Sequence, residues 1–172
     1  VRRCQANIQT ATGQIKLIFE KKMSTINLEK KPPYAVLLGL DNFIGLQSAR
    51  VLANRAVPVI GIAIDPGLEF CKTKCVEKVL VADPEKEDEY IDIWIHLGKQ
   101  LDEKAVLFPC LDEYVFLLSR NRNVLEPYFH FSLPEPDILK SLVIKEDFIR
   151  LCQKHGLRIP KTEFLHHKED AV

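Results

Sequence analysis

From Tyr34 onward, short apolar runs rich in β-branched residues alternate with longer segments in which apolar residues recur every three or four positions. This alternation predicts a parallel sheet, because parallel strands are joined by crossovers that usually contain a helix. Strands are predicted over 34–39, 57–64, 78–82, 105–108 and 129–133, and helices over 44–54, 85–101, 112–120, 137–142 and from Lys145 onward. We therefore expect an α/β fold, a Rossmann-like parallel sheet of four to five strands with helices on both faces.

Composition limits the class of protein. The chain has 172 residues, of which 47% are hydrophobic, enough to bury the core of one compact domain. Twenty-four basic residues balance twenty-four acidic ones, so neither nucleic acid nor a membrane surface is an expected partner. The apolar runs are much shorter than the roughly 20 residues that span a bilayer. Five cysteines without regular spacing indicate free thiols, and hence a cytoplasmic location.

The first 22 residues differ from the rest. They carry five basic residues against one acid, Glu20, and lack the apolar core of a secretory signal. Such a leader could be a transit peptide. However, Met23 is the one methionine in the chain, and Met23-Ser24-Thr25 has the form of a natural start. Residues 1–22 are therefore expected to be a disordered or non-native extension without a packed role, and 23–33 a polar lead-in.

The turn after the first predicted strand lies where doubly wound sheets place their ligands. Gly39 permits a tight turn, and Gly45 permits close packing of the following helix on the strand. Asp41 or Asn42 could bind the amine of a substrate. An alternative of equal weight is that both glycines serve packing alone.

A dinucleotide site is disfavoured at this turn. Asp65 follows Gly45 by twenty residues and ends the second strand, as the ribose-binding acid of a nicotinamide site would. However, the pattern G-x-G-x-x-G is incomplete, because Asp41 stands at the middle glycine position. Its carboxylate would repel a pyrophosphate.

The predicted fourth strand ends at the same edge of the sheet, so Cys110 and Asp112 are candidates for lining the ligand crevice. Asp112 also suits a helix N-cap, which by itself explains its presence. A buried small hydrophobic role is the commoner one for a cysteine such as Cys110. The spacing of Cys71 and Cys75 does not fit a zinc site, and no transition-metal site is expected.

Lys145 stands at the amino end of a predicted amphipathic helix. Ile144, Phe148, Leu151 and Cys152 follow helical spacing, which would hold this helix against the core. Free backbone N–H groups and the positive end of the helix dipole attract anions there, and an ammonium group adds a movable charge. The pattern indicates a contact with phosphate.

Residues 34–165 resemble the N-terminal, pre-ATP-grasp portion of ATP-grasp carboxylate-amine ligases. Relatives commonly show Asp-Lys where this chain has Ile144-Lys145, so the lysine's contact with ATP carries over and the acid's contribution does not. The matching pieces are Leu38-Gly39-Leu40-Asp41-Asn42 with Gly45, Val57-Pro58-Val59-Ile60-Gly61-Ile62 with Asp65-Pro66, Leu107-Phe108-Pro109-Cys110-Leu111-Asp112, Leu133-Pro134-Glu135-Pro136-Asp137, and 145–162.

The resemblance implies a three-part enzyme that converts a substrate carboxylate to an acyl phosphate, which an amine then attacks. Residues 34–142 would form the pre-ATP-grasp domain and 143–172 the start of an incomplete ATP-grasp region. ATP and Mg²⁺ would serve the full-length parent, with small-molecule carboxylate and amine substrates. The metal carboxylates and the glycine-rich loop would lie beyond Val172, so the chain alone is expected to be inactive and to bind no cofactor tightly.

If the resemblance holds, Lys145 would contact ATP, and it assigns no catalytic or metal-binding residue to this chain. Substrate contacts are expected from Gly39, Asp41, Asn42, Gly45, Cys110 and Asp112. The competing interpretation is a non-catalytic Rossmann-type module that binds a small ligand or a dinucleotide in the same crevice. The sequence fixes neither the substrates nor the oligomeric state.

Overall fold

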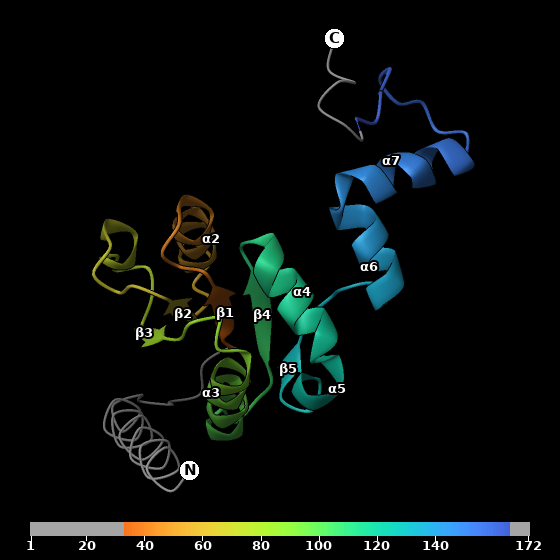
Figure 1. Cartoon of the computed structure of the whole chain (residues 1–172). Helices are drawn as coiled ribbons and strands as arrows, with labels where there is room; N and C mark the ends of the chain where they lie inside the picture. Colours follow the sequence, from red (N-terminus) through yellow and green to blue (C-terminus); the bar gives the residue numbers. More distant parts are fainter. Residues whose placement is uncertain (1–32, 166–172) are drawn as a thin grey trace, which may run out of the picture. The chain divides into compact units, whose positions relative to one another are not determined.

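A computed structural model describes residues 33–165. Its centre is a sheet of five parallel strands in the order β3-β2-β1-β4-β5 (Figure 1). The strands are β1 (Ala35–Leu38), β2 (Val59–Ala63), β3 (Lys78–Val81), β4 (Ala105–Pro109) and β5 (Phe129–His130). The predicted α/β fold is confirmed. The predictions for 1–22, for most of the lead-in at 23–33 and for 166–172 lie outside the described residues.

Helices cover both faces of the sheet. They are α2 (Phe43–Ala53), the 3-10 turn η1 (Glu69–Cys71), α3 (Glu87–Gln100), α4 (Asp112–Arg120), α5 (Arg122–Leu125), α6 (Pro136–Val143) and α7 (Lys145–Lys154). Figure 1 shows α2 and α3 on opposite faces. The ring of Tyr90 in α3 stacks on Tyr114 in α4, with centroids 5.9 Å apart, so α4 shares the face of α3. Within 33–165, every helix is too short or too polar to cross a membrane.

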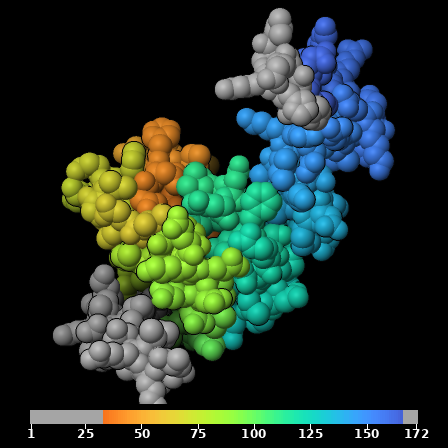
Figure 2. All heavy atoms as spheres, in the orientation of Figure 1, coloured from red at the N-terminus to blue at the C-terminus, as the bar shows by residue number. Residues whose placement is uncertain are grey.

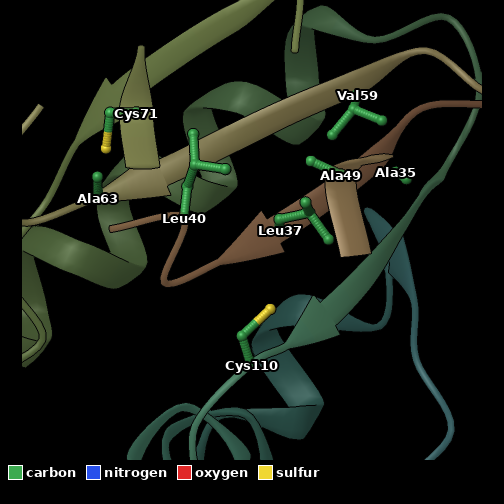
Figure 3. Close-up of a cluster of buried hydrophobic side chains, with 8 residues drawn as sticks. All are labelled: Ala35, Leu37, Leu40, Ala49, Val59, Ala63, Cys71 and Cys110. Carbon is green, nitrogen blue, oxygen red and sulfur yellow. The ribbon is translucent and has the colours of Figure 1, made fainter. Parts of the chain in front are cut away.

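The core is built around β1, in which all four residues are buried. The side chain of Leu37 faces α2, where it joins a cluster with Ala35, Ala49 and Val59 (Figure 3). The opposite face of the sheet packs against the fully buried rings of Trp94 and Tyr90, which meet edge to face with centroids 4.7 Å apart. Burial on both faces explains why β1 and β2 are continuous apolar runs rather than alternating ones.

The last strand is shorter than predicted. The prediction covered 129–133, whereas β5 ends at His130. Beyond it, Arg122 Nη2 donates to the carbonyl oxygens of Leu133 and Pro134, at 2.8 and 2.9 Å. These bonds attach the segment to α5, a short helix that the prediction missed. The segment leads to α6, which packs on α4 and α7; Figure 2 shows the lighter blue atoms of α6 beside the teal part of the chain, with the darker blue atoms of α7 beyond them.

Close contact between α2 and the turn after β1 depends on Gly45. A Cβ atom at this position would overlap the carbonyl oxygen of Gly39 and lie 2.8 Å from Leu40 Cα. Both are backbone atoms, which cannot rotate away. Gly45 therefore permits close packing of α2 on the turn that follows β1, rather than on the strand itself.

We predict that Gly45→Ala lowers the free energy of unfolding by about 1 to 3 kcal/mol, although alanine favours a helix by about 1 kcal/mol. Urea unfolding of the whole chain would measure the change. Gly67→Ala is the control, because its Cβ would approach a side-chain oxygen of Asp65 at 3.0 Å and this side chain can move. Equal stability of the two variants would contradict the packing role of Gly45.

Candidate functional site

The site is built where β1 and β4 end side by side. The two strands are parallel neighbours, and Cys110 N donates to Leu38 O at 3.0 Å just past their ends. The chain then leaves β1 for α2 on one face and β4 for α4 on the other. In doubly wound sheets, such a reversal marks the place where ligands bind, and the edge between these two turns is called the crevice below. The structure thus brings the predicted β1 turn residues, Gly39 to Gly45, to the same edge as Cys110 and Asp112.

The β1–α2 turn is fixed by its own hydrogen bonds. Gly39 has a φ of 91°, a conformation that other residues rarely adopt. Asn42 is the N-cap of α2: its Oδ1 accepts from Gly45 N at 3.0 Å, and its Nδ2 donates to Gly39 O at 2.6 Å. The amide of Asn42 therefore holds the turn in shape, a structural role that coexists with any contact to a ligand.

Asp41 ties this turn to the end of β2. Its Oδ2 accepts from Ile64 N at 2.7 Å and from Asp65 N at 3.3 Å. No hydrogen bond to the other oxygen, Oδ1, is recorded among residues 33–165, and the side chain is only half-buried. One carboxylate oxygen thus has a structural role, while the other has no hydrogen bond among the described residues.

Two observations oppose a dinucleotide at this turn. A Cβ on Gly39 would lie 2.7 Å from Cε2 of Tyr114, so an aromatic ring already occupies the space beside this glycine. Asp65, the ribose-binding candidate, instead accepts from Gly67 N through Oδ1 at 2.8 Å. Both observations agree with the prediction from sequence that a nicotinamide dinucleotide is disfavoured at this turn.

Cys110 and Asp112 differ in accessibility. The thiol of Cys110 is 7% exposed and points toward Leu37 and Ala49 (Figure 3). Burial raises its pKa to about 11. Asp112 is exposed and lies in the first turn of α4, where the positive end of the helix dipole stabilises a carboxylate. The N-cap is Leu111, so the prediction that Asp112 caps the helix was wrong by one residue.

The rim of the crevice edge is apolar, which sequence reasoning missed. Large apolar side chains are exposed at the start of α2, just after β2, and at and after the end of β4. They are, in that order, Phe43 (63%) and Ile44 (54%), Ile64 (46%), and Phe108 (38%) and Leu111 (38%). Helical and strand spacing assign such residues to a core, so the signal could be found only by noting that they crowd the strand ends. Exposed apolar groups gathered at one edge are typical of surfaces that bind a ligand or further protein.

Lys145 is the first residue of α7, as predicted, and is exposed. Two acids, Glu146 and Asp147, follow it in the same turn, and Glu146 forms an ion pair with Arg150 at 2.7 Å. α7 packs mainly on α6, and it is α6 that contacts α4. The acids reduce the attraction of this helix end for anions.

The described residues offer no metal centre: within 33–165, no group of three or more His, Cys, Asp or Glu side chains is placed to hold an ion.

Comparison with known proteins relates part of the sequence to ligases. No family model matches the chain. D-aspartate ligase of Enterococcus faecium (strain Aus0004) is 26% identical over 94 residues, 52% of this chain and 22% of that protein. Allergen Fel d 4 of Felis catus is 31% identical over 86 residues, 49% of this chain and 43% of that protein. Each match covers about half of this chain and less than half of the other protein, and the name of the second protein describes no enzymatic reaction.

Solved structures match more of the chain. L-amino acid ligase from Bacillus licheniformis superposes with a TM-score of 0.57 over 84% of this chain, at 10% identity. N5-carboxyaminoimidazole ribonucleotide synthetase from Thermotoga maritima superposes with a TM-score of 0.51 over 81%, at 18% identity. This chain spans 35% of either protein. The predicted resemblance to ATP-grasp carboxylate-amine ligases is confirmed at the level of the fold.

We predict that Asp41→Ala removes protection of the Ile64 amide against hydrogen exchange and lowers stability by about 1 to 2 kcal/mol, because an acceptor is lost. Asp41→Asn keeps an acceptor oxygen in place and should preserve most of the protection. Exchange measured by NMR on both variants gives the answer. Unchanged protection of Ile64 in the alanine variant would show that Asp41 does not tie the two strand ends.

We also predict slow alkylation of Cys110. With a pKa of about 11, about one thiol in a thousand is ionised at pH 8, and the group is buried as well. The half-buried Cys75 is the internal comparison. Mass spectrometry of the chain treated with iodoacetamide should show Cys75 modified first, and rapid labelling of Cys110 would place its thiol in the crevice instead of the core.

Proposed function

We propose that this chain is the N-terminal, pre-ATP-grasp portion of a cytoplasmic ATP-dependent ligase that joins a carboxylate to an amine through an acyl phosphate. Residues 34–142 would form the domain and 143–172 the start of the ATP-grasp region. The observation that carries the proposal is the fold, which 84% of the chain shares with an L-amino acid ligase. The crevice at the ends of β1 and β4 supports it, because such sheets bind ligands there.

In this proposal the crevice holds a small substrate. Asp41 Oδ1 and the exposed carboxylate of Asp112 are suited to the ammonium form of an amine, since charge-assisted hydrogen bonds to carboxylates are strong. Gly39 and Gly45 keep the turn compact, and Asn42 holds its shape. The apolar rim of Phe43, Ile44, Ile64, Phe108 and Leu111 would exclude water once covered.

The residues present do not form an ATP or Mg²⁺ site by themselves. Lys145 is suited to a phosphate contact, but the acids that follow it oppose a second anion. The part of the chain that the structure describes lacks a carboxylate cluster for magnesium. We therefore derive no phosphoryl-transfer step from these residues; metal ligands and the remaining ATP contacts would come from the rest of the parent protein.

A second candidate function is a non-catalytic Rossmann-type module that binds a small ligand. This candidate is favoured because Asn42 and Oδ2 of Asp41 are already used in hydrogen bonds within the protein, which leaves fewer polar groups of the turn for a reacting substrate. A module of this kind that bound a dinucleotide would bind NAD.

We predict that NAD does not bind measurably to the chain, since the carboxylate of Asp41 would repel a pyrophosphate and the ring of Tyr114 fills the space beside Gly39. Isothermal calorimetry would detect binding. Micromolar affinity that Asp65→Asn abolishes would overturn the ligase proposal in favour of a dehydrogenase.

The ligase proposal is tested in the longer protein read from the natural coding sequence past Val172. We predict release of ADP from ATP that depends on both a carboxylate and an amine. Lys145→Ala should weaken ATP binding or slow the reaction by about 1 to 3 kcal/mol, the range for one charge-assisted contact. Lys154→Ala, at the other end of α7, is the control.

In the 172-residue chain alone, Lys145→Ala should alter neither stability nor ATP binding, because an exposed lysine in a first helical turn contributes little. A longer protein that ligates normally without Lys145 would reduce it to an ordinary surface residue. A longer protein without ATP-dependent ligation would favour the binding module.

A further inference from the structure

A second hollow lies away from the crevice, at the amino ends of β4 and β5. It has a volume of about 500 Å³, within the usual size range of small-molecule sites. Because the strands are parallel, this end of the sheet is opposite to the turns that hold Asp41 and Asp112. The lining residues are Lys104, Val106, Glu126, Phe129, His130, Phe131 and Ser132.

The hollow exists because one face of the sheet is left open. Val106 pairs with Ala35 in β1 and with His130 in β5, so these side chains share the face that carries α2. α2 packs mainly on β1, β2 and η1. In the described part of the chain, Val106 is consequently half-buried and His130 is exposed. The neighbouring residue Phe129 points the other way and is buried.

The polar rim of the hollow carries one lysine and one glutamate, and only the glutamate is in an ion pair among residues 33–165. Lys104 Nζ donates one hydrogen bond to the backbone oxygen of Glu126 at 2.8 Å, which orients the ammonium and leaves two N–H groups for a ligand. The carboxylate of Glu126 is paired with Nη1 of Arg122 at 3.2 Å, and Arg122 lies over the ring of Phe131, 5.6 Å from its centroid. The negative charge of Glu126 is therefore neutralised by Arg122, whereas the ammonium of Lys104 remains available to an anion.

We propose that this hollow binds a small organic anion, a carboxylate or phosphate attached to an apolar body. Lys104 supplies the charge for the anionic group. His130 in the edge strand β5 offers a ring N–H in either tautomer, and the hydroxyl of Ser132, just past the end of β5, adds a second donor. Val106 and Phe131 contact the apolar body. The site is independent of the proposed ligase function, since none of its residues belongs to the crevice.

The experiment titrates the ¹⁵N-labelled chain with phenyl phosphate and, separately, with phenylacetate, followed by NMR. Saturable shifts are expected at the amides of Val106, His130, Phe131 and Ser132. The neutral analogue benzyl alcohol should shift them at least tenfold more weakly, because it cannot use the charge-assisted bond. The phosphate and carboxylate arms show which anionic group the site prefers.

Lys104→Gln should weaken binding of the better probe at least tenfold, whereas Lys154→Gln, an exposed lysine on α7, should not change it. If Lys104→Gln lowers the melting temperature, His130→Gln serves instead, with a smaller loss expected at the same amides. Shifts confined to other regions, equal binding of benzyl alcohol, or full affinity in both variants would overturn the proposal.

Discussion

Burial of β1 on both faces is the constraint on which the rest of the structure depends. A strand with no exposed side chain must be paired along both edges, and β2 and β4 supply the hydrogen bonds. Helices must then cover both faces, which sends the chain in opposite directions after β1 and β4. The crevice at these two strand ends follows from the packing of the centre, before any functional residue is considered.

The fold could be read from the sequence because continuous apolar runs such as 59–63 have few other solutions. Errors occurred where distant contacts decide local structure. β5 ends at His130, and the carbonyl of Leu133 in the following segment accepts a hydrogen bond from Arg122, which nothing in the local pattern reveals. Likewise, Leu111 rather than Asp112 is the N-cap of α4, although its side chain can make no capping hydrogen bond.

The candidate site was only partly predictable for the same reason. Spacing identified the turn from Gly39 to Gly45, but the acceptor role of Asp41 toward Ile64 joins residues 23 positions apart. Burial of Cys110 could be anticipated from residue type, whereas the ring of Tyr114 beside Gly39 could not, because it arrives from another helix. The substrate roles of these residues remain predictions.

The hydrogen bonds of Asp41 have a thermodynamic consequence. The carboxylate joins the turn after β1 to the start of the loop that contains η1. If a substrate amine binds at Oδ1, as proposed, its charge would draw electron density away from Oδ2 and weaken the hydrogen bond to Ile64 N. By reciprocity, loosening of the loop would then strengthen binding of the amine by the same factor. Under that proposal, one side chain would couple occupancy of the crevice to order in the neighbouring loop.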